Sequence, residues 1–154
     1  MSEARAVPPG AAARRGRTAR RVARELAFRV VYQGELTGDG LAATWAAVGE
    51  GGSWSADQRE LVDDVVGLLG TRGAEVDALL REACAHWPLE RLAATDRAVL
   101  RGAAAELLAR PGTPARVVLD EAVDIARRFG SEESGGFVNG VLDRVARRLR
   151  PGEL

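Results

Sequence analysis

The last third of the chain constrains the fold more than any other segment. Residues 117–149 hold two apolar series with helical spacing, separated by a polar turn that contains glycine at residues 130–136. The series are Val118, Ala122, Ile125, Ala126 and Phe129, then Val138, Val141, Leu142, Val145 and Leu149. Each series marks a helix face that must be buried. The segment therefore predicts a helical hairpin, and the rest of the chain must supply helices to cover it.

The remaining segments also show helical spacing, and none shows sustained strand alternation. Helix start and stop signals divide them into further helices. We expect one helix over residues 18–33 that ends at Gly34. Further helices should start at Asp39, at the capping box of Ser55 and Gln58, at Thr95, and at Thr113 with Pro114. Gly70 and Gly73 should break the helix that starts at Ser55. The prediction is an all-α fold of six or seven helices packed as bundles.

Composition narrows the class of protein. The 154 residues, 46% of them hydrophobic, fit one domain with a substantial core. No apolar run approaches the ~18 residues of a membrane span, and the N-terminal residues lack the apolar middle of a secretory signal. A single cysteine, Cys84, excludes an internal disulfide and fits a reducing compartment. We therefore expect a cytoplasmic protein without a membrane partner.

The net charge of zero hides a strong asymmetry. Residues 1–24 carry a formal charge of +6 and residues 25–154 a charge of −6. Residues 1–16 contain proline, glycine and alanine without apolar periodicity, which predicts a disordered basic arm. Residues 17–150 then form a single helical domain, and residues 151–154 a short tail. An anionic partner for the basic end is the expectation.

Four arginines open the first predicted helix at intervals of three or four residues, so they should stack along one exposed side of its first turns. Positive charge at a helix N-terminus opposes the macrodipole by roughly 0.3–1 kcal/mol for each badly placed charge. A cluster there predicts an anionic partner that neutralises it, because the charges do not help the helix. All 22 basic residues of the chain are arginine, which fits either codon usage or a need for planar guanidinium groups. The four are Arg17, Arg20, Arg21 and Arg24.

The sequence offers little catalytic chemistry. The one histidine, His86, follows a predicted helix beside Trp87, and Cys84 lies on an apolar helix face. There is no metal-ligand spacing, and without lysine neither a Schiff base nor a usual P-loop is available. We predict no catalytic residue, no metal and no cofactor. Exposed aromatic side chains could instead stack on unpaired bases, although periodicity places Phe137 and Tyr32 in the core as readily as on the surface.

Several blocks of the sequence resemble the NusB transcription antitermination family. They read TDRAVLR at residues 95–101, VLDEAV at 118–123, ARRFG at 126–130 and FVNGVLD at 137–143. The stretch RRVARELAFRVVYQ at residues 20–33 also resembles that family's arginine-rich first helix. The resemblance covers residues 17–150, and the FVNGVLD string is its most specific part.

The resemblance implies two packed helical bundles, no catalysis, and binding to the single-stranded boxA segment of nascent ribosomal transcripts. It also implies a partner, the ribosomal protein NusE, with which the protein joins the RNA polymerase antitermination complex; a homodimer is left open. By position, it assigns RNA binding to Arg14, Arg15, Arg17, Arg20, Arg21, Arg24, Tyr32, Glu133, Ser134 and Phe137, and NusE binding to Glu90 and Asp96.

One departure from the family pattern affects the RNA site. Gly135 and Gly136 stand where many members have a basic or polar pair. Without those side chains, either the N-terminal arginines or backbone amides of the turn must take a larger share of the phosphate contacts.

Two other functions remain as alternatives. The first is a NusB-like RNA-binding domain that serves ribosomal RNA methylation. It is the less favoured, because such enzymes carry a cofactor-binding domain after the helical one and these residues stop at Leu154. The second is a dimerising helical protein whose arginines touch nucleic acid or lipid without specificity. A preference for boxA over scrambled RNA separates these readings.

Overall fold

The hairpin predicted for the last third of the chain is present. It consists of α5 (Ala115–Phe129) and α6 (Ser134–Leu149) in a computed structural model that describes residues 11–154, with side chains from Thr18 onward. The two apolar series are buried except at Leu149, which is half-buried, and Phe129, which is 43% exposed. The turn is shorter than predicted, because α6 already begins at Ser134 and residues 134 and 135 are buried.

The described residues form six α-helices and one 3₁₀ turn, with no strand among residues 11–154. The all-α prediction is confirmed, and the predicted count of six or seven helices is close. Besides the hairpin, the elements are α1 (Ala11–Thr37), α2 (Leu41–Glu50), α3 (Ala56–Ala83), η1 (Leu89–Arg91) and α4 (Ala94–Ala109). None of these helices is long and apolar enough to cross a membrane.

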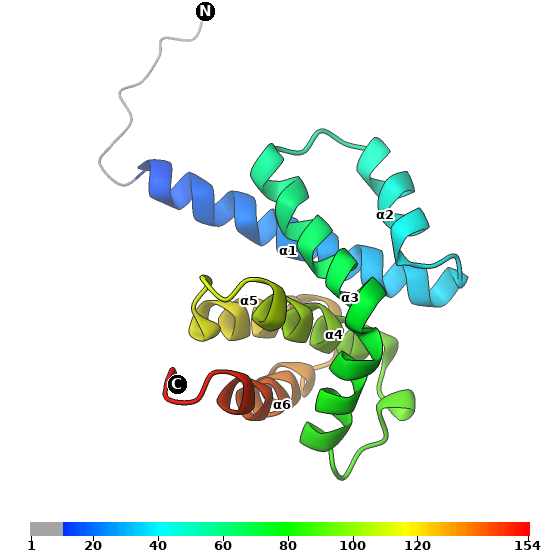
Figure 1. The fold of residues 1–154 in the computed structure, drawn as a ribbon, viewed down its shortest axis with the longest axis vertical. Helices are drawn as coiled ribbons and strands as arrows, with labels where there is room; N and C mark the ends of the chain where they lie inside the picture. The colour runs from blue at the N-terminus through cyan, green and yellow to red at the C-terminus, as the bar shows by residue number, and fades with distance from the viewer. Residues whose placement is uncertain (1–10) are drawn as a thin grey trace, which may run out of the picture.

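The helices form two packed groups that share α3 (Figure 1). The first half of α3 lies with α1 and α2, and its second half continues down beside α4 and α6. Helix α4 packs against α1, α3, α5 and α6, so it lies at the centre of the molecule. Its residues Ala98, Leu100, Ala104 and Ala105 are completely buried. The three alanines allow the surrounding helices to approach α4 closely.

Helix α1 is longer than predicted at both ends. It begins at Ala11, so the prediction of disorder is wrong for residues 11–16. Residues 1–10, for which disorder was also predicted, lie outside the described structure. At the other end the helix passes through Gly34 to Thr37. A Cβ atom on Gly34 would lie 3.1 Å from Leu41 and 3.2 Å from Thr44, so this glycine makes room for α2. Gly38, at φ +72°, ends the helix.

Of the predicted N-cap residues, only Ser55 caps its helix. Ser55 and Gln58 form the predicted capping box. Asp39, Thr95 and Thr113 do not cap, because α2, α4 and α5 follow other N-cap residues. Those N-cap residues are Gly40, Ala93 and Pro114.

The predicted break in α3 is a kink. Arg72, at φ −128° and ψ 24°, lies between Gly70 and Gly73, and the helix then resumes with Val76 and Leu80 fully buried. The kink lets one helix contribute to both packed groups.

Candidate nucleic-acid interface

Arg24 is part of the core of the protein. Its side chain is 8% exposed and lies against Glu106 of α4, whose side chain is 4% exposed. Arg24 donates from Nε to Oε1 at 2.9 Å and from Nη2 to Oε2 at 2.8 Å. This bidentate geometry fixes α1 on α4. The prediction of four arginines stacked along an exposed side of the helix is therefore wrong at Arg24.

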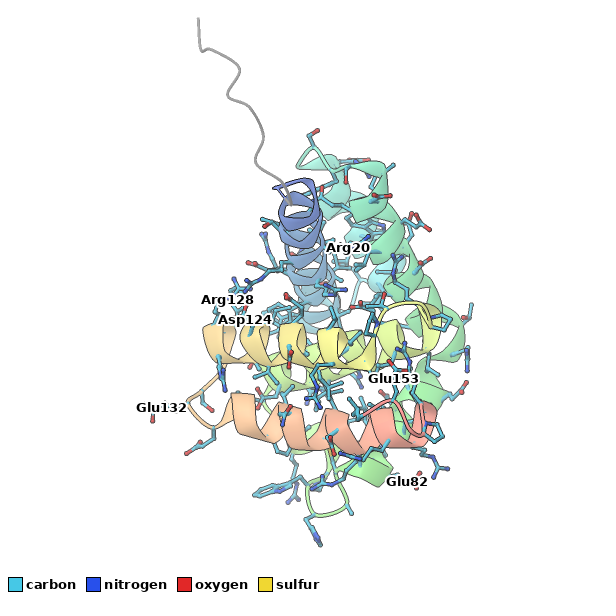
Figure 2. All side chains as sticks on the ribbon, turned by 90° about the vertical axis from the view of Figure 1, so that its left-hand side faces the viewer. Arg20, Glu82, Asp124, Arg128, Glu132 and Glu153 are labelled. Carbon is cyan, nitrogen blue, oxygen red and sulfur yellow. The ribbon has the colours of Figure 1, made fainter. Side chains whose placement is uncertain are left out.

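Arg21 and Arg20 are exposed on α1, and they differ in their partners. Arg21 donates to Asp124 of α5 at 2.7 Å and lies 3.3 Å from Glu121, and these carboxylates raise the pKa of its guanidinium. Arg20 forms no ion pair with any described side chain, and it lines a groove of about 650 Å³ together with the carboxylates Glu60, Asp64 and Glu121. Figure 2 shows Arg20 on α1, with Asp124 on the neighbouring part of α5. The predictions for Arg14, Arg15 and Arg17 concern side chains outside the described set.

Tyr32 belongs to a ladder of rings that joins α1 to the end of α5. It is half-buried, and its ring stacks on Phe28 with centroids 5.9 Å apart. Phe28 in turn contacts Phe129, with centroids 5.3 Å apart. The guanidinium of Arg128 lies 5.4 Å from the centroid of the Phe129 ring, and Arg128 also pairs with Glu25 of α1 at 3.1 Å. A cation over an aromatic face is a stabilising arrangement.

Phe129 is the binding candidate that the sequence did not reveal. Its place in the apolar series predicted burial, but it is the last residue of α5, where the helix axis leaves the core. Its position directly before Gly130 was the available signal, because a residue at a helix end has fewer covering neighbours.

The turn between α5 and α6 is held together by Ser134. This side chain is 2% exposed, and its Oγ accepts a hydrogen bond from the Ser131 amide at 3.0 Å. A Cβ atom on Gly130 would lie 2.4 Å from the same oxygen, so the turn needs glycine there. Ser134 was predicted to contact RNA, but its hydroxyl is buried and engaged within the turn. Glu133, by contrast, is exposed and caps no backbone amide with its side chain.

Phe137 lies one helical turn into α6 and is half-buried. It packs against the core and faces a groove between α6 and the end of α3. The glycine pair before it has two different surroundings. A Cβ atom on Gly135 would lie 2.9 Å from the Arg127 side chain, whereas one on Gly136 would meet nothing within 4 Å.

The basic part of α1 and the aromatic corner lie on one side of the molecule. Ion pairs from Arg21 to Asp124 and from Arg128 to Glu25 hold α1 beside α5, and the ring ladder reaches the turn. Figure 2 shows this side, with Glu132 of the turn projecting outward. We call this surface the α1–α5 face, defined by Arg20, Arg21, Tyr32, Arg128 and Phe129.

The two acidic positions predicted to bind a protein partner lie at another corner. Arg97 donates to the Glu90 carbonyl at 3.3 Å and to the Leu92 carbonyl at 2.9 Å, which ties η1 to the first turn of α4. Glu90 is exposed, and the hydrogen bond from Arg81 lowers the pKa of its carboxyl group. Asp96 is half-buried in the first turn of α4, where the helix dipole favours a negative charge.

The described residues define an all-helical protein of two packed helical groups, with arginines and aromatic rings on one exposed side. Residues 21–147 match the model of the NusB family, and the chain belongs to that family. The resemblance seen at residues 17–150 is thereby confirmed.

Named relatives and solved structures agree with this assignment. The transcription antitermination protein NusB of Sorangium cellulosum is 44% identical over 131 residues, which cover 85% of this chain and 94% of that protein. The structure of T. maritima NusB superposes with a TM-score of 0.79 at 34% identity, covering 87% of this chain and 94% of that one. A structure of the antitermination factors NusB and NusE in complex with dsRNA matches with a TM-score of 0.71 at 28% identity, covering 85% and 98% of the two chains.

Proposed function

We propose that this NusB-family protein is a transcription antitermination factor that binds the boxA segment of nascent ribosomal transcripts together with NusE. In this role it joins the RNA polymerase antitermination complex in the cytoplasm. The close relatives carry the name of antitermination proteins, and a structural relative has been solved with NusE and RNA. Tethering RNA to a protein complex requires no covalent step, so the function needs neither a catalytic residue nor a cofactor.

The observation that carries the RNA proposal is the α1–α5 face. Exposed guanidinium groups attract phosphates, and an adjoining exposed ring can stack on an unpaired base. Arg20 and Arg21 supply the first, and Phe129 with Tyr32 supplies the second. Glu133 at the edge of the same corner offers a carboxylate that can accept from a base amino group.

The structure refines the list of residues in this proposal. Arg24 and Ser134 support the interface from inside, because both are buried with their polar atoms engaged. Arg14, Arg15 and Arg17 remain proposed phosphate contacts, since they precede Arg20 in the same helix. Phe137 remains a proposed base contact.

We place the NusE contact at the corner of η1 and α4. Glu90 and Asp96 are carboxylates tied to the same backbone segment through Arg97. An acidic corner complements a basic ribosomal protein and guides its approach. This corner uses different elements from the α1–α5 face, so RNA and NusE can bind together.

A titration of RNA tests this function. Fluorescently labelled boxA RNA and a scrambled RNA of equal length are titrated with the protein at ~150 mM salt, each with and without NusE. We expect boxA to bind more tightly and NusE to increase the preference. Equal affinity for both RNAs in the presence of NusE would reject boxA recognition and favour nonspecific binding, since phosphate attraction alone does not read sequence.

A further inference from the structure

The end of α3 and the outer side of α6 enclose a second aromatic surface. It is a groove of about 330 Å³ with Trp87 and Phe137 in its walls. Trp87 is 63% exposed, the largest exposed fraction among the large hydrophobic side chains of the described residues. An indole ring held in water at this level contributes little to the core. We call this surface the α3–α6 groove, defined by Trp87, Gly136, Phe137, Gly140 and Arg144.

Two glycines leave the α6 side of the groove open. Gly136 and Gly140 are one helical turn apart and both line the groove. A Cβ atom built on either would meet nothing within 4 Å, so packing does not require glycine at these positions. Glycine nevertheless weakens a helix by about 1 kcal/mol relative to alanine. Because these two glycines have no side chain, the surface of α6 stays open where it lines the groove with Trp87 and Phe137.

The groove is lined by one arginine, Arg144, and one carboxylate, Glu82. Arg144 donates from Nη1 to the Ala83 carbonyl at 2.8 Å, and among the described side chains it has no carboxylate partner. Glu82 is already paired with Arg148 at 3.0 Å. Burial raises the pKa of the Cys84 thiol, so that group stays neutral. An anchored guanidinium beside an exposed indole therefore faces any molecule that enters.

We infer that the α3–α6 groove is a binding subsite for one unpaired RNA nucleotide, with the base stacked on Trp87 and its phosphate near Arg144. This subsite extends the proposed RNA-binding function and rests on it. An anion fits the unpaired charge of Arg144, and a flat ring fits the space between two aromatic side chains above glycine. Phe137 lines the groove and lies in the first turn of α6, close along the chain to the α5–α6 turn that follows Phe129.

Substitutions of Trp87 test the subsite in the complete protein. Trp87→Ala should weaken boxA RNA binding about tenfold, because base stacking on an aromatic ring is lost. Trp87→Phe should retain most of the affinity, since phenylalanine also presents a π-face. In the wild-type protein, RNA should quench part of the tryptophan fluorescence, and the quenched part should be missing from Trp87→Phe. Leu36→Ala, at a 61% exposed position on α1 outside the groove, is the matched control and should bind RNA normally.

Two further variants probe the floor and the charge of the groove. Gly140→Ala should unfold at the same or a higher temperature than the wild type, yet bind RNA more weakly, because its methyl group enters the path of the base. Arg144→Gln should weaken binding and reduce the salt dependence by about one phosphate contact.

The outcomes separate this subsite from the proposed function. If Trp87→Ala and Arg144→Gln bind boxA RNA like the wild type while Arg20→Ala with Arg21→Ala weakens binding about tenfold, the subsite is rejected and the function stands. If they impair NusE binding and leave binding of RNA alone unchanged, the groove is a protein-docking surface and the inference is wrong. Absence of any boxA preference in the wild-type protein would instead reject the function itself.

Discussion

The α1–α5 face and the α3–α6 groove both present arginines beside aromatic rings, but their charges are balanced differently. On the face, Arg21 and Arg128 are each paired with carboxylates of the neighbouring helix. In the groove, Arg144 donates only to a backbone carbonyl. RNA must therefore compete with two intramolecular acids for Arg21, while no carboxylate among the described side chains pairs with Arg144. The number of arginines on a surface does not measure its attraction for phosphate.

Arg24 marks the inner limit of the α1–α5 face and should give the largest effect. Arg24→Ala leaves the buried Glu106 carboxylate without its partner, so we expect unfolding to become easier by about 3–5 kcal/mol. Urea denaturation followed by circular dichroism measures this change. Replacing both partners, as Arg24→Met with Glu106→Leu, should recover much of the loss. A single variant as stable as the wild type would contradict the structural role of Arg24.

Removal of the exposed arginines should affect binding and spare the fold. Arg20→Ala with Arg21→Ala is expected to weaken boxA RNA binding about tenfold and to reduce the slope of log affinity against log salt by about 1.4, or 0.7 for each lost phosphate contact. The unfolding midpoint should change little, because both side chains are exposed. RNA titrations at several salt concentrations provide the test. An unchanged slope would exclude these arginines from phosphate contact.

Removal of one of the two carboxylates that pair with Arg21 should raise RNA affinity instead of lowering it. Asp124→Asn removes the acceptor at 2.7 Å from Arg21, and we expect RNA affinity to rise about two- to fivefold, the scale of an exposed ion pair. Glu75→Gln is the control, because Glu75 pairs with Arg72 on α3 away from the face. Equal affinities of Asp124→Asn and the wild type would show that the carboxylate does not compete with RNA.

The smallest expected effect is a change in the pKa of Glu90. This residue lies at the corner of η1 and α4, outside both proposed RNA surfaces. The Arg81 hydrogen bond holds the pKa of Glu90 below its usual range. The contribution of this contact to stability is therefore present above the ordinary glutamate pKa of ~4.3 and is lost as the pH falls through the lowered value. A carboxyl ¹³C NMR titration should show the Glu90 pKa rising toward the ordinary value in Arg81→Ala. The same Glu90 titration in both proteins would rule out this contact in solution.

The sequence was sufficient to predict what local periodicity and capping determine. The buried series of α5 and α6 follow from spacing, and the capping box at Ser55 follows from side-chain chemistry within four residues. Gly34 was read as a helix end because its role depends on α2, which packs on it. Such close approaches between helices leave no local signal.

The candidate interface was only partly predictable for the same reason. The partner of Arg24 lies 82 residues away in the chain, so spacing along α1 could not distinguish a buried arginine from an exposed one. Phe129 matched the apolar period of α5 and is nevertheless exposed where the helix ends. Trp87 lies between α3 and η1, where no helical period exists to predict its exposure.

Chemical-shift mapping of boxA RNA onto the ¹⁵N-labelled protein tests the central claim most directly. We expect the largest amide shifts at residues 20–21, 32 and 129–137, with an additional indole shift from Trp87. Shifts confined to α2 and the first half of α3, with those residues unmoved, would place RNA elsewhere and contradict the proposed interface.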